Sequence, residues 1–308
     1  MPLANFLQIF QIRRLHFDLV TPATLLVVTA MAAVFRVYDD KSSARHDGVL
    51  AHYTEMRTNQ SLAFSRLQKA KWLSSWGSRV GGRMTIREAL HACDSFIDRS
   101  DPDTVLPNSI HMLQAAEGAR AAGKPDWYIL TALIHDIGKL MYLWGSPEEG
   151  QGGKATDPQW SLGGDTWIVG VAIPQCAVHS HLNVLSPDAS NPLINLTPTG
   201  LYSPHVGIMQ CEFAWGHDEY AYLWALHNKV KIPREGLAML RLHSCYPWHT
   251  GGAYTELEEE GDAQLKEAVK DFNQFDLYTK AEAAPDFLTV WPFYQEIIDR
   301  LAPGVLDW

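Results

Sequence analysis

Four histidines and two aspartates, spread widely along the chain, are the residues best suited to chemistry in this sequence. They are His111, His135, Asp136, His217, His243 and Asp276. Each lies in an apolar or aromatic stretch, where an unpaired polar group would be costly to bury. One zinc ion normally uses three or four protein ligands. Six nitrogen and oxygen ligands therefore favour two metal ions that share a carboxylate and keep positions open for chemistry.

The adjacent pair His135-Asp136 lies in the strongly apolar segment Trp127–Leu143, for which we predict one continuous buried helix. Neighbouring side chains leave a helix about 100° apart, so His135 can bind one ion while Asp136 bridges two. Lys139 is four positions after His135 and is predicted on the same face, where it would donate a proton or hydrogen bond to a substrate oxygen. We expect its pKa to be lowered by burial beside two cations. The alternative is a purely structural Lys–Asp pair.

The other candidate ligands must be positioned by the elements around them. Apolar residues at helical spacing predict helices over residues 49–73, 86–97, 110–122, 211–228, 234–246 and 263–278. Residues 145–210 contain most of the glycines and prolines and are predicted to form loops, and strand patterns are few. The sequence therefore predicts an all-α fold with few short strands.

Composition limits the classes of function. The 308 residues suffice for one large domain or two small ones, and at 46% hydrophobic the chain can bury a substantial core. A net charge of −10 without a basic stripe argues against nucleic acid as a partner. The four cysteines are scattered without a CxxC pair, which favours a reducing compartment, and we expect a cytoplasmic protein.

The N-terminus carries an apolar run, Leu19–Phe35, behind Arg13 and Arg14, an order that resembles a signal peptide or a signal anchor. Its 17 residues are fewer than the ~20 expected for a membrane span, and Pro22 weakens it further. We expect no membrane insertion. The chain is divided into an N-terminal extension over residues 1–35 and a single domain over residues 36–308.

The sequence segments that surround the candidate ligands resemble those of the myo-inositol oxygenase family of HD-domain di-iron proteins. The segments are SDPDTVLPNSIHMLQAAEGAR, DWYILTALIHDIGK, WGHDEYAY, RLHSCYPWHT and FNQFDLYTK. One histidine, an HD pair and a distant aspartate form the H…HD…D arrangement of HD-domain metalloproteins. The resemblance extends from about residue 35 to the end, and the stretch Gly150–Asp157 is an insertion relative to the family pattern.

The resemblance implies an HD-type helical bundle with a di-iron centre in a mixed-valent Fe(II)/Fe(III) state. It implies that His111, His135 and Asp276 bind one iron, that His217 and His243 bind the other, and that Asp136 bridges them. The implied reaction is ring opening of myo-inositol by O2 to give D-glucuronate, a four-electron oxidation. The residues alone leave the metal open, because imidazole and carboxylate ligands suit iron, manganese or zinc.

The family's substrate contacts are carried over to a set of polar residues, and Lys139 and Asp136 are the expected catalytic residues. The implied contacts are Arg36, Asp98, Arg99, Ser100, Lys139, Gly164, Asp165, His243 and Ser244. A polyol needs a dense set of hydrogen-bond donors and acceptors, which these side chains supply. Considered without the family, each has a plain structural explanation, such as a helix-end charge for Asp98.

Two other classes of function stay open at this stage. An HD-type metal-dependent phosphohydrolase would need several cations to hold a phosphate, and Lys139 is the one that this pattern offers. A non-catalytic metal-binding or membrane-tethered scaffold is the third hypothesis. For the oxygenase, we expect a monomer whose partners are myo-inositol and O2, with no nucleic acid.

Overall fold

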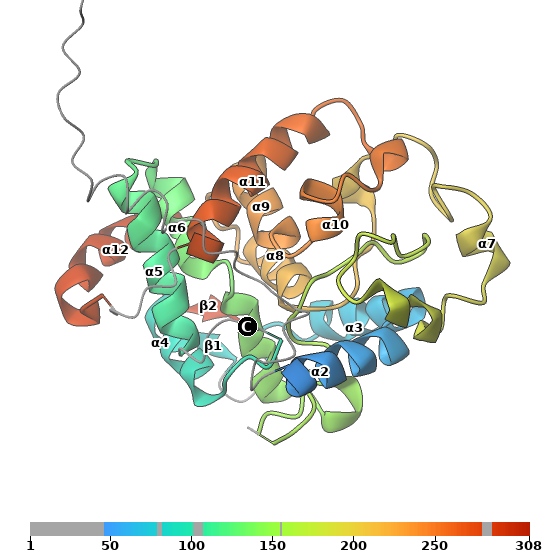
Figure 1. The fold of residues 1–308 in the computed structure, drawn as a ribbon. Coiled ribbons are helices and arrows are strands. Elements are labelled where there is room, and N and C mark those ends of the chain that lie inside the picture. Colours follow the sequence, from blue (N-terminus) through green and yellow to red (C-terminus); the bar gives the residue numbers. More distant parts are fainter. Residues whose placement is uncertain (1–45, 79–81, 101–106, 155, 279–284) are drawn as a thin grey trace, which may run out of the picture. The chain divides into compact units, whose positions relative to one another are not determined.

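The computed structural model describes residues 46–308 apart from residues 79–81, 101–106, 155 and 279–284. This part of the chain is mainly helical (Figure 1), as the sequence predicts. A small antiparallel sheet pairs β1 (Arg83–Met84) with β2 (Leu306–Asp307). The predicted extension over residues 1–35 and Arg36 lie outside the described residues. Among the helices of the described part, none has both the length and the apolar character that crossing a membrane requires.

The helices follow one another along the chain with short connections, except between residues 150 and 216, where loops dominate. The α-helices are α2 (His46–Asn59), α3 (Leu62–Leu73), α4 (Ile86–Ala92), α5 (Asn108–Ala121), α6 (Asp126–Ile134), α7 (Pro192–Asn195), α8 (His217–His227), α9 (Arg234–Leu242), α10 (Tyr246–His249), α11 (Asp262–Tyr278) and α12 (Phe287–Leu301). The 3-10 helices are η1 (Cys93–Ser95), η2 (Ile137–Trp144), η3 (Pro147–Glu149), η4 (Ser180–Leu185), η5 (Ile208–Gln210) and η6 (Thr255–Leu257).

The helix predicted over residues 49–73 is two helices, because the chain breaks at Gln60 and Ser61. Ser61 caps α3 by accepting a hydrogen bond from the Phe64 backbone N–H. The buried Gln60 amide donates to the Trp215 carbonyl at 2.6 Å and accepts from the Trp215 N–H at 3.0 Å. Gln60 thereby fixes the segment that leads into α8, a long-range pairing that local sequence cannot reveal.

The main core lies where α6 packs against α5 and α9, while α11 packs against both of these neighbours. Every side chain of α6 from Tyr128 to Ile134 is buried, so this part of the helix is surrounded by the core on all sides. Phe272 of α11 and Trp224 of α8 are fully buried in the same cluster. Burying each large aliphatic side chain contributes roughly 1.5–3 kcal/mol, and this core therefore holds the helices that carry the candidate ligands.

The continuous helix predicted over Trp127–Leu143 is wrong, because it is interrupted at the candidate ligands. The helix α6 ends at Ile134, Asp136 has φ −95° and ψ 2°, and the chain continues as the 3-10 helix η2. In a 3-10 helix, side chains three positions apart eclipse each other. Lys139 therefore lies over Asp136, and the expectation that it shares a helical face with His135 fails in this geometry.

The close approach of η2 to the start of α8 depends on a glycine. A Cβ atom at Gly138 would lie 2.0 Å from the His217 carbonyl oxygen, a backbone atom that cannot rotate away. Gly138 therefore lets the segment after Asp136 lie against the backbone that carries His217.

We expect Gly138→Ala to lower the free energy of unfolding by about 1–3 kcal/mol, because overpacking forces the backbones apart. Gly48→Ala in α2 is the matched control, since a Cβ there meets no atom within 4 Å and the change should stabilise by about 0.4–1 kcal/mol. Chemical denaturation of both variants measures the difference. Equal midpoints for the two variants would show that the close contact is not tight.

Candidate metal centre

The six predicted ligands lie at or beside helix ends, which the core brings together. His111 is in the first turn of α5, His135 and Asp136 follow α6, His217 begins α8, His243 follows α9, and Asp276 is in the last turn of α11. All are buried except His111, whose side chain is 12% exposed. The structure thus gathers residues that are up to 165 positions apart in the sequence.

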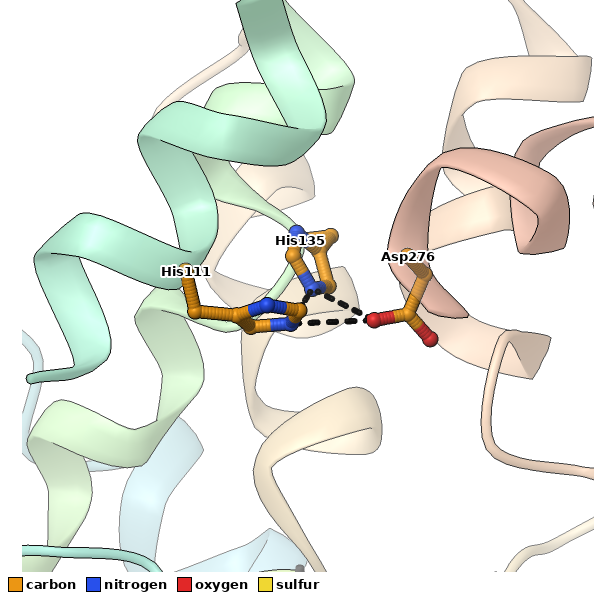
Figure 2. A group of neighbouring side chains, drawn as sticks. All are labelled: His111, His135 and Asp276. Atoms are coloured by element: carbon orange, nitrogen blue, oxygen red, sulfur yellow. Dashed lines mark hydrogen bonds and ion pairs between the residues drawn. The ribbon is translucent and has the colours of Figure 1, made fainter. Parts of the chain in front are cut away.

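The first group surrounds one point with side chains from three helices. Figure 2 shows the rings of His111 and His135 and the carboxylate of Asp276 directed at one another. The His111 Nε2 lies 3.2 Å from the His135 Nε2 and 3.0 Å from Asp276 Oδ1, and His135 Nε2 lies 3.5 Å from that oxygen. Asp136 Oδ2 is 3.5 Å from both ring nitrogens.

The second group gathers around the other oxygen of Asp136. The Nε2 atoms of His217 and His243 are 3.2 Å apart. Asp136 Oδ1 lies 3.1 Å from the first and 3.7 Å from the second. The two oxygens of Asp136 therefore face different pairs of imidazoles, which is the arrangement of a carboxylate that joins two groups.

The separations between these donor atoms fit metal binding. Donors at about 2.1 Å from one ion are about 3.0 Å apart in octahedral and about 3.4 Å apart in tetrahedral geometry. The four donors of the first group are separated by 3.0–3.5 Å wherever a contact joins them. The clusters His111–His135–Asp276 and His135–Asp136–His243 could each hold an ion.

The hydrogen bonds of the histidine rings support the same conclusion. The Nδ1 atoms of His135, His217 and His243 lie 2.8 Å, 2.9 Å and 3.1 Å from backbone carbonyl oxygens. A carbonyl accepts only from an N–H, so Nδ1 carries the proton and Nε2 carries the lone pair. In the neutral rings these lone pairs face other lone pairs and carboxylate oxygens, an arrangement that a cation between them stabilises.

Two buried atoms beside the first group have no hydrogen-bond partner among the described residues. They are Nδ1 of His111 and Oδ2 of Asp276. A buried carboxylate oxygen without a partner costs free energy unless a ligand or ion satisfies it. The unsatisfied oxygen of Asp276 therefore fits a second bond to a metal or a bond to a bound molecule.

The charges of the cluster are strongly coupled. Burial opposes ionisation of Asp136, but Lys139 and then His135 outweigh it and hold the pKa of Asp136 well below its usual range. Burial also lowers the pKa of His217, but Asp218 and Asp136 outweigh it and raise this pKa to about 10. Metal binding requires unprotonated imidazoles, so loading this centre should release protons.

Lys139 lies between two carboxylates. Its Nζ is 2.7 Å from Asp136 Oδ2 and 2.8 Å from Asp98 Oδ2. Burial lowers the pKa of Lys139, but Asp136 and then Asp98 outweigh burial and raise this pKa above its usual value. The lowered pKa expected beside two bound cations stays a prediction, and the two carboxylates act on this pKa in the opposite direction.

A cavity opens beside both groups and is lined almost entirely by polar residues. Its lining comprises Asp98, Ser100, His111, Asp136, Lys139, Gly164, His217, His243, Ser244 and Asp276. Six of the predicted substrate contacts are in this set. Asp98 is held there by the Ser100 hydroxyl, which donates to Asp98 Oδ1 at 2.7 Å.

Other predicted contacts point elsewhere or lie outside the described residues. The Arg99 guanidinium donates to the Asp157 carbonyl at 3.1 Å, at the end of the predicted insertion. The Asp165 backbone N–H donates to the Tyr53 hydroxyl at 2.9 Å, which in turn lies 3.5 Å from Asp165 Oδ1. The structure does not place either residue in the cavity lining, and it does not describe Arg36.

Sequence reasoning missed Asp218, whose buried carboxylate lies within the second group. Its Oδ1 is 2.6 Å from His217 Nε2 and 3.4 Å from His243 Nε2. A signal was present, because His217-Asp218 repeats the HD dipeptide of His135-Asp136.

A buried ion pair supports the second group from behind. Arg241 donates to both oxygens of Glu219, from Nε at 2.6 Å and from an η nitrogen at 3.0 Å. Lys69 lies 2.9 Å from the same carboxylate. Because Glu219 and Arg241 are each two residues from a candidate ligand, His217 and His243, their pairing fixes the start of α8 against the end of α9.

Comparison with known proteins places the chain among inositol oxygenases. A sequence model of the family "Myo-inositol oxygenase" matches residues 46–308. Inositol oxygenase of Mus musculus is 40% identical over 265 residues, which cover 85% of this chain and 87% of that protein. The Homo sapiens protein is 39% identical over 282 residues, covering 88% and 93%. Inositol oxygenase 5 of Arabidopsis thaliana is 38% identical over 282 residues, covering 91% and 86%.

We expect Arg241→Met to lower the free energy of unfolding by about 3–5 kcal/mol, because it leaves the Glu219 carboxylate buried without its bidentate partner. Arg300→Met is the control, since Arg300 pairs with Asp126 at 2.5 Å on the surface with about half of each side chain exposed, and such pairs contribute about 0–1 kcal/mol. Urea unfolding followed by tryptophan fluorescence compares them. Similar losses in both variants would show that burial does not strengthen the Arg241 pair.

Proposed function

Because the chain belongs to the myo-inositol oxygenase family, we propose that it opens the ring of myo-inositol with O2 to give D-glucuronate in a four-electron oxidation. The observation that carries this proposal is the family match over residues 46–308, a range that contains all six candidate ligands and the described cavity. Relatives named inositol oxygenase in animals and a plant support it.

We propose that the resident metals are two irons in a mixed-valent Fe(II)/Fe(III) state. His111, His135 and Asp276 would hold one, His217 and His243 the other, and Asp136 would bridge them. This assignment is supported by the two groups of donors around the two oxygens of Asp136 and by the absence of thiolate among them. When bound, the ions would supply Lewis acidity toward substrate hydroxyls and the redox capacity to use O2.

The cavity residues would bind and orient the polyol. The Asp98 carboxylate, the Ser100 and Ser244 hydroxyls and the Lys139 ammonium offer both acceptors and donors within one lining. A ring of hydroxyls can bond to all of them, because each hydroxyl both donates and accepts. Gly164 adds a stretch of backbone without a side chain, which leaves room for the ring.

Lys139 is the residue we propose to act on the substrate oxygen. Its Nζ lies between the carboxylates of Asp136 and Asp98, which favour the protonated form, so it would donate a hydrogen bond to that oxygen and stabilise negative charge that develops on it.

The remaining predicted contacts would act on the substrate from outside the described cavity lining. Arg99 would contribute through its backbone, because its guanidinium bonds to Asp157. Asp165 would act next to Gly164 while the Tyr53 hydroxyl holds it. Arg36 would help to close the cavity, since excluding water protects reactive species from side reactions.

We also propose a monomeric cytoplasmic enzyme whose catalytic unit is a single HD-type domain over residues 36–308. Residues 1–35 would then be an extension outside the catalytic unit. These statements rest on the family match over residues 46–308 and on the sequence pattern.

A phosphohydrolase is less well supported by the cavity. Among the described lining residues, Lys139 is the one lysine or arginine, and it already lies between two carboxylates. A phosphate would meet the acidic side chains of Asp98, Asp136 and Asp276 there, whereas a neutral polyol brings no charge of its own.

The proposed reaction is tested with iron-loaded protein, myo-inositol and O2. We expect O2 consumption and formation of a uronate in a one-to-one ratio, with no phosphate released from phosphoesters under the same conditions. Asp136→Ala is the matched control and should lose both irons and all turnover, because the shared carboxylate joins the two groups. Phosphate release without uronate from the wild-type protein would contradict the proposal.

We expect Lys139→Met to retain the wild-type iron content but to lower kcat by about 100-fold or more, the range typical of removing a donor that stabilises developing negative charge. Lys124→Met is the control, since Lys124 pairs with Asp271 at 2.6 Å on another part of the fold. Iron analysis and uronate formation are measured on the same samples. An unchanged kcat in Lys139→Met would rule out the proposed role of this lysine.

A further inference from the structure

We propose that His52 is a positioning residue of the cavity, which fixes the backbone at Gly163 and Gly164 and thereby sets how tightly the polyol binds. His52 lies in α2 and is not among the described residues that line the cavity. The inference rests on the proposed function, in which Gly164 contacts the substrate, and it adds a residue that acts through this contact.

The His52 ring reaches the loop that leads into the cavity. Its Nε2 lies 3.1 Å from the Gly163 carbonyl oxygen, across 111 positions of the chain. Since a carbonyl only accepts, the ring donates from Nε2. His52 is 5% exposed and Gly163 is also buried, so water has little access to either group. A buried carbonyl that lost this donor would keep the full cost of its desolvation.

The next residue of α2 holds the same loop at a second point. The Tyr53 hydroxyl accepts from the Asp165 backbone N–H at 2.9 Å. Two adjacent residues of one helix therefore bond to the loop on either side of Gly164, which has φ +101° and lines the cavity. A Cβ atom at Gly164 would lie 3.2 Å from the Tyr53 hydroxyl oxygen and 3.3 Å from His52 Nε2. The helix thus lies directly against the backbone that Gly164 offers to a polyol.

The same loop also contacts the acidic wall of the cavity. A Cβ atom at Gly163 would lie 2.7 Å from Asp98 Oδ2 and 3.0 Å from Ser100 Oγ. Asp98 Oδ2 is in turn 2.8 Å from Lys139 Nζ. A shift of the Gly163 backbone would therefore displace the side chains that are proposed to bond to the hydroxyls of the substrate, so the His52 bond bears on more than one contact.

The charge state of His52 suits a geometric role. Burial lowers the pKa of His52 below its usual value, and the opposing effects of Asp98 and of the bond to Gly163 do not outweigh burial. The ring is therefore neutral at neutral pH and does not compete with Lys139 for the charge of Asp98. Loss of a neutral donor should change how well the substrate is held and leave the charges of the reacting groups as they are.

The proposal is tested by isothermal titration calorimetry of the iron-loaded protein with myo-inositol in the absence of O2. We expect His52→Leu to raise the Kd by about 5- to 50-fold, because the Gly163 carbonyl loses its donor. His52→Gln should bind nearly as tightly as wild type, since its side-chain amide can donate to the same carbonyl. A lower folded fraction would change the stoichiometry of the titration but not the Kd.

Thr54→Val is the matched control on the same helix. It removes a side-chain hydrogen bond to a backbone carbonyl, but that carbonyl belongs to Leu50 of α2 and not to the loop. Its Kd should equal that of wild type. His52→Phe is a second test variant, which keeps an aromatic ring but cannot donate, and it should weaken binding as His52→Leu does.

Uronate formation by the same samples separates positioning from a merely structural role. In His52→Leu the KM for myo-inositol should rise by a factor similar to the rise in Kd while kcat changes little, because binding is lost equally from the ground state and the transition state. A merely structural role would reduce the amount of active protein, and so the apparent kcat, without changing KM.

The outcomes distinguish this inference from the proposed function. An unchanged Kd in folded His52→Leu and His52→Phe would refute the role of His52 and leave the oxygenase standing. Equal weakening in His52→Gln or in Thr54→Val would also refute it, because the bond to Gly163 would then not be the cause. Wild-type protein that neither binds myo-inositol nor forms a uronate would refute the proposed function, and the inference with it.

Discussion

The rest of this structure depends on one electrostatic constraint, the convergence of imidazole lone pairs and carboxylate oxygens in a buried space. Backbone carbonyls fix the proton of His135, His217 and His243 on Nδ1, so that Nε2 points inward as an acceptor. Acceptors that face acceptors repel each other unless a proton or metal ion lies between them. The fold therefore holds together a set of groups that is stable only with positive charge at its centre.

Holding such a set requires rigid supports that do not themselves bind the ion. Gln60 bonds to both backbone groups of Trp215 ahead of α8, and Glu219 pairs with Arg241 between α8 and α9. Gly138 lets the two backbones approach each other directly. These contacts join segments that are far apart in the sequence, and they oppose the repulsion among the donors before any ion is bound.

The identity of the donor residues could be predicted from the sequence, whereas the backbone geometry around them could not. Polar residues such as His135 and Asp136 are conspicuous in an apolar helix, and the family resemblance supplied the pairing that the structure brings together. The break after Ile134 was not predictable from apolar spacing, since an α-helix and a 3-10 helix bury similar residues over one or two turns. The 3-10 geometry also determines which side chains surround Lys139. Its contact with Asp98 joins segments far apart in the sequence, so local spacing could not reveal it.

The balance of charge in the cavity also bears on what the protein can bind. Asp98, Asp136, Asp218 and Asp276 bring four carboxylates to the centre, and Lys139 brings one ammonium. The excess of carboxylates over this ammonium favours cations in this space, and it disfavours an anion such as a phosphate ester in the cavity. A polyol avoids this conflict, because it enters as a neutral molecule and offers negative charge only where a hydroxyl loses its proton. An acidic lining therefore suits a neutral substrate, because bound cations and not the substrate would compensate the carboxylates.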